Sequence, residues 1–466
     1  MIGSIVLSVI GVDEQVPDLS GKTVRYINFD NAASTPPLQA TMQTVNDFMP
    51  WYSSVHRGSG FKSQLSTHSY EQARDIVASF FGANKTDHVV IFGKNTTEAI
   101  NKLSYRLDYS PDDVVLVSML EHHSNDLPWR PRAQVEHITT DVLGQLDEDH
   151  FDKLLQLHKG RVKLVAVTGG SNVTGHIPNI HSLAKKAHAH GAQILVDCAQ
   201  LAPHRVVDMK PLSDPSHLDY IAVSAHKLYA PFGTGALIGR RDTFESGEPD
   251  QRGGGTIKLV TTDEVEWASP PDCDEAGSPN VVGAIALAKS LRVLGGVGMK
   301  KIAKHEAELT AYALTHLNKI NGVRVYGDTS PRSSSSRLGV IPFNVKDLPH
   351  ALTAAILGAE WGIAVRSGCF CAHPYVTSLL DVSQAELAKF RSDVRNNNFS
   401  TMPGFVRVSF GLYNTTKEIN RLTTALSAIA TGEYRGRYKK DIKTGDYVVA
   451  SWPPSFTSYF DLSQRS

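Results

Sequence analysis

The sequence has few cysteines, only four in 466 residues. A disulfide framework is therefore excluded, and a reducing, cytoplasmic setting is expected. An excess of charge of one sign is also lacking, because 47 lysines and arginines balance 47 aspartates and glutamates. That balance gives no reason to expect a nucleic acid or an anionic membrane surface as a partner.

Long hydrophobic runs are missing as well. No stretch reaches the roughly 18 apolar residues that a membrane-spanning helix needs. Residues 1–15 contain a short apolar run, but no basic residue precedes it and no small-residue cleavage pattern follows, so a signal peptide is not expected. The composition, 41% hydrophobic and 20% charged, is that of an ordinary globular protein long enough for one large and one smaller domain.

Short apolar runs alternate with helical patterns between residues 85 and 240. We expect strands at residues 88–92, 114–118, 162–168, 193–196, 220–224 and 235–238. Helices are expected at 96–105 and 180–190, and Gly191 stands where a C-cap glycine belongs. Strands that are apolar on both faces and alternate with helices predict an α/β fold, with a mostly parallel sheet covered by helices on each side.

A second pattern begins near residue 295 and predicts a smaller C-terminal α+β domain. Its expected elements are helices at 299–318 and 348–358 and strands at 323–326, 339–343 and 405–409. The expected division is a large domain at 26–292, a small domain at 293–432 with residues 1–25 packing on it, and a tail at 433–466. The tail is polar and basic, and its sequence predicts no role.

Two residues at expected strand ends carry the chemistry. Asp197 ends one strand, and Lys227 follows another in Ser224-Ala225-His226-Lys227. Open α/β sheets place ligand chemistry at these ends. Pyridoxal 5'-phosphate (PLP) needs a lysine that binds it covalently and an acid that keeps its pyridine nitrogen protonated. Lys227 and Asp197 are the candidates for these two tasks.

Ten short motifs occur in order between Tyr26 and Leu422. They are NFDNAAS, VHRGSG, NTTEAIN, EHHSN, SNVTG, DCAQ, SAHK, EAGSPN, RSGCFCAHP and VRVSFGLYNT. Together they resemble the class V aminotransferase group of fold type I PLP enzymes, and within it the cysteine desulfurase branch. The resemblance implies PLP fold type I, with a large domain and a smaller C-terminal domain.

The resemblance also implies roles for the cofactor's neighbours. His122 is similar to the imidazole that stacks on the PLP ring and exchanges protons with the substrate. Asn172 and Gln200 are similar to side chains that bind the ring oxygen. Thr97, Ser224 and His226 are similar to side chains that bind the phosphate. Ser278 resembles a residue that reaches the phosphate of the neighbouring subunit, which implies a homodimer with shared sites.

Two arginines are candidates for binding the substrate carboxylate. Arg407, in VRVSFG, resembles the family's bidentate carboxylate ligand, and Arg366, in RSGCFC, is a second candidate. The alternative to substrate binding, for either arginine, is a structural ion pair.

The segment RSGCFCAHP places Cys371 where the desulfurase branch has the cysteine that attacks the substrate sulfur. Such a thiolate needs a mobile loop to reach the substrate and then leave with a persulfide. Cys369 and Phe370 stand where related enzymes have two histidines. This pair, and the long stretch at 376–404, resemble the desulfurase-like domain of molybdenum cofactor sulfurases. A metal site at Cys369, Cys371 and His373 is not expected, because no second ligand pair accompanies it.

The other cysteines have no expected chemistry. Cys198 ends a buried strand and is interpreted as packing, and the sequence predicts no role for Cys273.

The resulting hypothesis is a PLP-dependent cysteine desulfurase that acts on L-cysteine, with a sulfur-acceptor protein as a possible partner. Enzymes on the same fold that stay open are a cysteine or cystine C–S lyase, an aminotransferase and an epimerase of the isopenicillin N type. A non-catalytic sulfur carrier is the alternative of another class, and the presence of Lys227, Asp197 and His122 argues against it.

Overall fold

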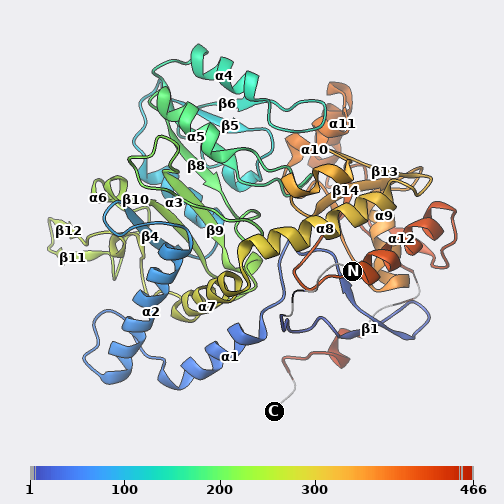
Figure 1. Cartoon of the computed structure of the whole chain (residues 1–466), viewed down its shortest axis with the longest axis horizontal. Helices are drawn as coiled ribbons and strands as arrows, with labels where there is room; N and C mark the ends of the chain where they lie inside the picture. Colours follow the sequence, from blue (N-terminus) through green and yellow to red (C-terminus); the bar gives the residue numbers. More distant parts are fainter. Residues whose placement is uncertain (1–4, 6, 451, 453–454, 464–466) are drawn as a thin grey trace.

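The computed structural model describes residues 5, 7–450, 452 and 455–463. Its centre is a seven-stranded sheet in the order β4, β10, β9, β8, β7, β5, β6 (Figure 1). The strands are β4 (His88–Gly93), β5 (Val114–Ser118), β6 (Gln134–Ile138), β7 (Val162–Thr168), β8 (Gln193–Asp197), β9 (Tyr220–Ser224) and β10 (Gly235–Arg240). Strand β10 runs antiparallel to β4 and β9, and the other neighbours pair in parallel. The expected mostly parallel sheet is confirmed.

Helices cover both faces of this sheet, because successive side chains of a strand point to opposite faces. Val89 and Ile91 of β4 belong to a core cluster with α3 (Thr96–Arg106). Val90 and Phe92 point the other way, into a cluster with α2 (Phe61–Phe80) and α7 (Val281–Val297). That larger cluster also contains residues of α1 (Gln39–Phe48), α4 (Glu148–Leu157) and α5 (Ile180–Ala189).

A second core lies around a four-stranded antiparallel sheet in the order β13, β14, β17, β16. These strands are β13 (Val323–Val325), β14 (Val340–Val345), β16 (Arg366–Gly368) and β17 (Phe405–Ser409). Helices α8 (Met299–Leu317), α9 (His350–Trp361) and α12 (Thr416–Ala430) bury their apolar faces in this core. Helix α8 runs from the large sheet towards this second core (Figure 1).

No single helix in the described part of the chain has both the length and the apolar character to cross a membrane. Helices α7 and α8 pass that test only when joined, and they are bent by 77° against each other.

Several sequence expectations match the observed elements residue for residue, among them β5, β7, β9 and β17. The expected helix at 348–358 is shifted, because Pro349 precedes the first turn of α9 and Gly362 ends it in the left-handed region at φ 64°. Several observed elements were not expected, among them β6 and α7. Strand β6 has few apolar residues, and α7 is apolar almost all round, so neither carries a clear period.

The N-terminal segment contacts both cores. The backbone N–H of Leu19 donates to Ala359 O of α9 at 2.7 Å. Ile5 and Val9, in contrast, are buried in the cluster of the large sheet. Part of the expected segment 1–25 lies outside the described residues. We keep the division at residues 292 and 293, and the assignment of residues 1–25 to the small domain, as proposals.

The tail is held on the small domain by Glu360 near the end of α9. The Glu360 carboxylate accepts the backbone N–H groups of Arg435 and Gly436 at 3.0 and 2.9 Å and the hydroxyl of Tyr438 at 2.9 Å. A hairpin of β18 (Tyr438–Lys440) and β19 (Tyr447–Val449) follows. It contacts the end of the long stretch at 376–404, where the Phe399 N–H donates to Ile442 O at 2.9 Å.

Candidate active site

A cavity of about 450 Å³ lies at the carboxyl ends of β7, β8 and β9, where β16 and β17 of the small domain approach. Eleven of the residues singled out in the sequence line it: Thr97, His122, Asn172, Asp197, Gln200, Ser224, His226, Lys227, Arg366, Cys371 and Arg407. Ser278 does not line it and is exposed in the loop before α7. The fold therefore brings together candidates from distant parts of the chain, and their individual roles stay predictions.

Lys227 and Asp197 enter the cavity from neighbouring strands. Lys227 ends the short turn Ala225–Lys227 after β9, and Asp197 is the last residue of β8. Burial lowers the pKa of Lys227 to about 8, although Asp197 opposes this change. A lysine with such a pKa has an appreciable unprotonated fraction near neutral pH, as a nucleophilic amine requires.

The Asp197 carboxyl is buried and accepts the backbone N–H of Ala199 at 2.9 Å. Burial raises its pKa, and the hydrogen bond and the charge of Lys227 compensate only in part. A protonated pyridine nitrogen is the kind of cation that stabilises such a carboxylate.

The N-terminus of α3 lies at the cavity, which Asn95, Thr96 and Thr97 line. Asn95 caps this helix by accepting the Glu98 N–H at 3.0 Å. The Thr96 N–H donates to the Ser224 hydroxyl at 2.9 Å, which ties the helix start to the end of β9. Thr97 is exposed towards the cavity one residue later. Helix N–H groups and the helix dipole favour a phosphate here.

His122 is held as a neutral imidazole at the edge of the cavity. Its Nδ1 accepts the backbone N–H of Ser124 at 3.1 Å, so the proton of the neutral ring resides on Nε2. Burial, and then the charge of Lys227, lowers the pKa of His122 to about 4. Its neighbour Glu121 anchors the loop, because it accepts the Asn125 amide and the Thr168 N–H at 2.7 and 2.6 Å.

Two amide side chains expected near the ring oxygen are engaged with the backbone. Asn172 Nδ2 donates to Phe370 O at 2.7 Å, and Gln200 Nε2 donates to Ala32 O at 2.6 Å. Each NH₂ group has a second proton, so a ring oxygen can still be bound. Asn172 thus also connects the cavity to the cysteine loop, which sequence reasoning had missed.

Both candidate arginines form ion pairs with Asp30. Arg407 Nη2 contacts Asp30 Oδ1 at 3.0 Å, and Arg366 Nε contacts Oδ2 at 3.1 Å. Arg407 is buried, and its Nε has no hydrogen-bond partner among the described residues, whereas the Arg366 side chain is 51% exposed. Asp30 lies in the NFDNAAS motif. Sequence reasoning assigned it no role, although an acidic residue within a motif was a signal that could have found it.

The Cys371 turn is conformationally strained. Phe370 and Cys371 both have positive φ, 53° and 55°. This region costs residues other than glycine about 1–3 kcal/mol each, so the turn needs outside support. Asn172 binds Phe370 O, and the Arg407 guanidinium lies 4.7 Å from the centre of the Phe370 ring.

The two thiols of the segment lie in different surroundings. Cys371 is exposed and lines the cavity, whereas Cys369 is buried and donates to Pro403 O at 3.0 Å. Burial raises the pKa of Cys369 to about 12, so this thiol stays protonated. Cys198 is fully buried among apolar residues, and Cys273 contacts Arg106 and Asp274.

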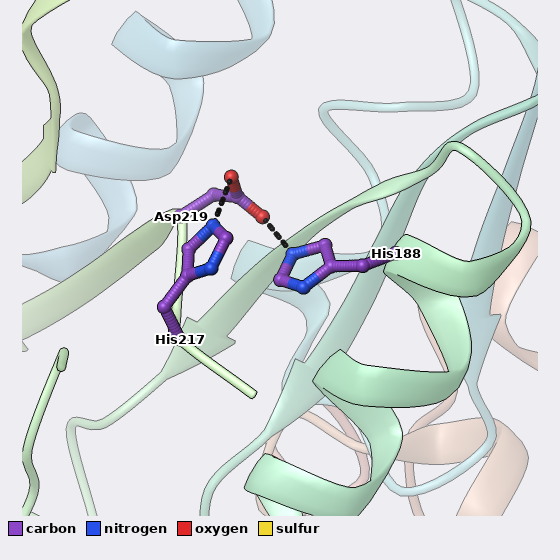
Figure 2. Close-up of side chains that lie close together, drawn as sticks. All are labelled: His188, His217 and Asp219. Carbon is purple, nitrogen blue, oxygen red and sulfur yellow. Dashed lines mark hydrogen bonds and ion pairs between the residues drawn. The ribbon is translucent and has the colours of Figure 1, made fainter. Parts of the chain in front are cut away.

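Among the described residues, one further cluster of ligand-type side chains lies at the opposite end of the sheet: His188, His217 and Asp219 (Figure 2). Asp219 bridges the two histidines, with Nε2 of His188 at 2.9 Å and Nε2 of His217 at 3.3 Å. The rings stack at 4.1 Å and 21°. A metal ion lies near the plane of each imidazole that binds it, and two nearly parallel planes do not meet between the rings. The arrangement therefore favours a carboxylate bridge over a metal site.

Comparisons with known proteins agree with this geometry. The family model described as aminotransferase class-V matches residues 27–422. A probable cysteine desulfurase from Halalkalibacterium halodurans is 35% identical over 427 residues, 90% of this chain and 96% of its own length. A cysteine desulfurase from Dickeya dadantii is 35% identical over 418 residues, 88% of this chain and 93% of its own.

Solved structures give the same grouping. The apo structure of a cysteine desulfurase from Thermococcus onnurineus has a TM-score of 0.76 at 32% identity, covering 87% of this chain and 95% of that one. The cysteine desulfurase CsdA from Escherichia coli has a TM-score of 0.72 at 29% identity, covering 88% and 96%. The chain therefore belongs to the class-V aminotransferase family of PLP enzymes, in its cysteine desulfurase-like branch.

Proposed function

We propose that the protein is a PLP-dependent cysteine desulfurase that takes sulfur from L-cysteine, releases alanine and carries the sulfur as a persulfide on Cys371. The observation that carries the proposal is that Lys227 and Cys371, from different domains, line one cavity. The names of the relatives, cysteine desulfurases that match most of this chain, support the substrate.

The residues of the cavity fit PLP by their chemistry. Bound PLP supplies an electron sink next to the substrate's α-carbon. Lys227 binds it and moves protons, and Asp197 holds the pyridine nitrogen protonated. The N-terminus of α3 with Thr97, Ser224 and His226 would hold the phosphate, and His122 would contact the ring. Asn172 and Gln200 bind the ring oxygen.

The electrons gained and lost in the sulfur transfer are equal, so no outside oxidant is needed. The Cys371 thiolate donates an electron pair to the substrate sulfur, and a new S–S bond forms. The Cβ–S bond breaks with its electron pair left on carbon, and that carbon takes a proton to give alanine. The sulfurs are oxidised to the persulfide level while Cβ is reduced by the same two electrons.

Product analysis tests this function against the open alternatives. The purified protein with PLP and L-cysteine is expected to form alanine, and alkylation followed by mass spectrometry is expected to detect a persulfide at Cys371. Pyruvate with ammonia, and no persulfide, would instead identify a C–S lyase. Formation of D-cysteine or consumption of a keto acid would point to an epimerase or an aminotransferase.

We infer a symmetric homodimer in which Ser278 reaches the partner's phosphate. Ser278 is exposed and lies outside the cavity of its own chain. Large apolar side chains elsewhere in the large domain are also exposed, including Trp51 at 47% and Phe61 at 69%. Exposed apolar area of this kind is typical of an interface.

Light scattering tests the assembly. The wild-type protein is expected at twice the mass of the chain, and Trp51→Glu with Phe61→Glu is expected to shift it towards the monomer with loss of activity. A fully active monomer would refute the shared site. The proposal also includes a sulfur-acceptor protein as partner. It further includes a cytoplasmic location and no nucleic-acid or membrane partner, which four free cysteines and a balanced charge support.

A further inference from the structure

A pair of histidines contacts the Cys371 turn from outside the cavity. His123, from the EHHSN loop, donates its backbone N–H to Cys371 O at 2.8 Å. Its ring stacks on that of His373 with the centres 4.9 Å apart and the planes 10° apart. Neither ring lines the cavity around Lys227. The pair therefore joins two loops, one from each domain, at the backbone of Cys371.

The contact between the two rings requires an unprotonated nitrogen on His123. Nε2 of His123 accepts the backbone N–H of His373 at 3.2 Å and lies 3.1 Å from its Nδ1. A backbone N–H is always a donor, so this Nε2 must present its lone pair. If His123 takes up a proton there, the new N–H faces the backbone N–H of His373, so the hydrogen bond from the His373 backbone is lost and only a bond to Nδ1 can replace it.

The turn that this pair supports does not hold itself in place. Phe370 and Cys371 are consecutive residues with positive φ, and Cys371 is exposed. On the cavity side, Asn172 and Arg407 contact Phe370. On the outer side, His123 contacts Cys371 O and the first residue of α10 (His373–Leu379). Without the His123 ring, only the hydrogen bond from the His123 backbone to Cys371 O remains on the outer side, and the start of α10 loses its contact.

We propose that His123 and His373 are positioning residues that hold the Cys371 thiol at the mouth of the cavity for sulfur transfer, and that protonation of His123 releases it. The inference rests on the proposed desulfurase function. It assigns neither histidine a contact with substrate or cofactor. Positioning of a nucleophile is worth large factors in rate, since a displacement of about 1 Å costs about 100-fold.

We call the contact between His123 and His373 the clamp. The charges around His123 set the pH at which the clamp opens. Burial and the neighbouring His373 lower the pKa of His123, Asp126 raises it, and Arg130 lowers it. His122 is a further titratable neighbour, with ring centres 6.3 Å apart, and Tyr105, Arg132 and Asp250 line a pocket together with His123. Burial also lowers the pKa of His373. Both rings are therefore neutral at neutral pH, and the clamp is closed there.

The test uses the PLP-loaded enzyme and the variants His123→Ala, His373→Ala and His123→Gln. The glutamine Oε1 reaches about as far as Nε2 and accepts hydrogen bonds, but it does not titrate. Both alanine variants are expected to lower the kcat of alanine formation at least tenfold, with an unchanged PLP absorbance and an unchanged spectral response to L-cysteine. His123→Gln is expected to retain most activity. In the wild type, protonation of His123 is expected to lower the rate below about pH 6.5, and in His123→Gln this decrease is expected to be absent.

Two controls separate the possible outcomes. His190→Ala, in a distant histidine that contacts Lys186 O and Gln156, is expected to behave as wild type. Cys371→Ser tests the proposed function itself. If Cys371→Ser is inactive while both alanine variants turn over normally, or if His123→Gln keeps the acid limb of the wild type, the clamp is refuted and the function stands. If Cys371→Ser is fully active, the function fails.

Discussion

Arg407, which lines the cavity, forms an ion pair with Asp30 at 3.0 Å, and its side chain is only 3% exposed. Burial lowers the pKa of Arg407 to about 10, against the effect of Asp30. Nη2 donates to Asp30 and Nη1 donates to Asn172 O at 2.9 Å, and each of these two nitrogens has a second N–H. Nε is buried and has no hydrogen-bond partner in the described part of the chain. This arrangement holds the planar fork in place and leaves donor capacity for a substrate carboxylate.

Arg407→Lys is therefore expected to weaken substrate binding. Loss of a charge-assisted bidentate contact costs about 1.5–3 kcal/mol, which corresponds to about a 10- to 100-fold lower kcat/KM for L-cysteine. Steady-state kinetics measures it, and most of the effect is expected in KM. Arg366→Lys is the matched control with a smaller expected effect, because that side chain is half exposed. An unchanged KM for Arg407→Lys would make the arginine a structural partner of Asp30 only.

Lys227→Ala is expected to abolish covalent PLP binding. The wild-type protein is expected to be yellow, with a visible absorbance that borohydride removes, because Lys227 is the amine in the cavity with a lowered pKa. Absorption spectroscopy after dialysis measures the difference. Lys304→Ala, whose side chain is 79% exposed, is the control and is expected to stay yellow. A colourless wild-type protein that ignores added PLP would overturn the central claim.

The two neighbouring thiols are expected to respond differently to serine. Cys371→Ser is expected to abolish alanine formation and persulfide while PLP binding stays intact. Cys369→Ser is expected to keep most activity, because a serine hydroxyl can also donate to Pro403 O, the contact that Cys369 makes at 3.0 Å. Amino-acid analysis and mass spectrometry measure both. Two inactive variants would indicate that sulfur passes from one thiol to the other.

The bridge between His188 and Asp219 is expected to make stability depend on pH. Although burial opposes it, the hydrogen bond to Asp219 raises the pKa of His188. A raised folded-state pKa contributes stability that is fully present below the unfolded value of about 6.5 and is lost as pH rises through the folded value. Denaturant unfolding of wild type and His188→Gln is expected to differ by about 1 kcal/mol below pH 6 and by less at pH 8. A constant difference across that range would contradict the linkage.

Asp219 works in the opposite direction. Burial would raise its pKa, but hydrogen bonds with His188 and His217 hold it well below the usual range. Its contribution is therefore present above the unfolded value of about 3.9 and is lost as pH falls through the lower, folded value. Asp219→Asn is expected to be less stable than the wild type at neutral pH, which the same unfolding measurement checks.

The sequence by itself determined most strands of the two sheets and the positions of Lys227 and Asp197 at strand ends. These follow from local patterns: apolar runs, the period of a helix, and motifs whose residues are neighbours in the chain. It failed locally where the period disappears, as in the uniformly apolar α7 and the polar edge strand β6.

Only the tertiary structure decided which distant side chains meet. Asp30 pairs with Arg407 and Arg366, His123 meets His373, and Glu360 holds the tail. No local pattern marks these pairs, because each joins segments that are far apart in the chain and come together only when the chain folds. The same packing directs Cys371 into the cavity and Cys369 away from it, since two successive residues with positive φ reverse the chain between the thiols.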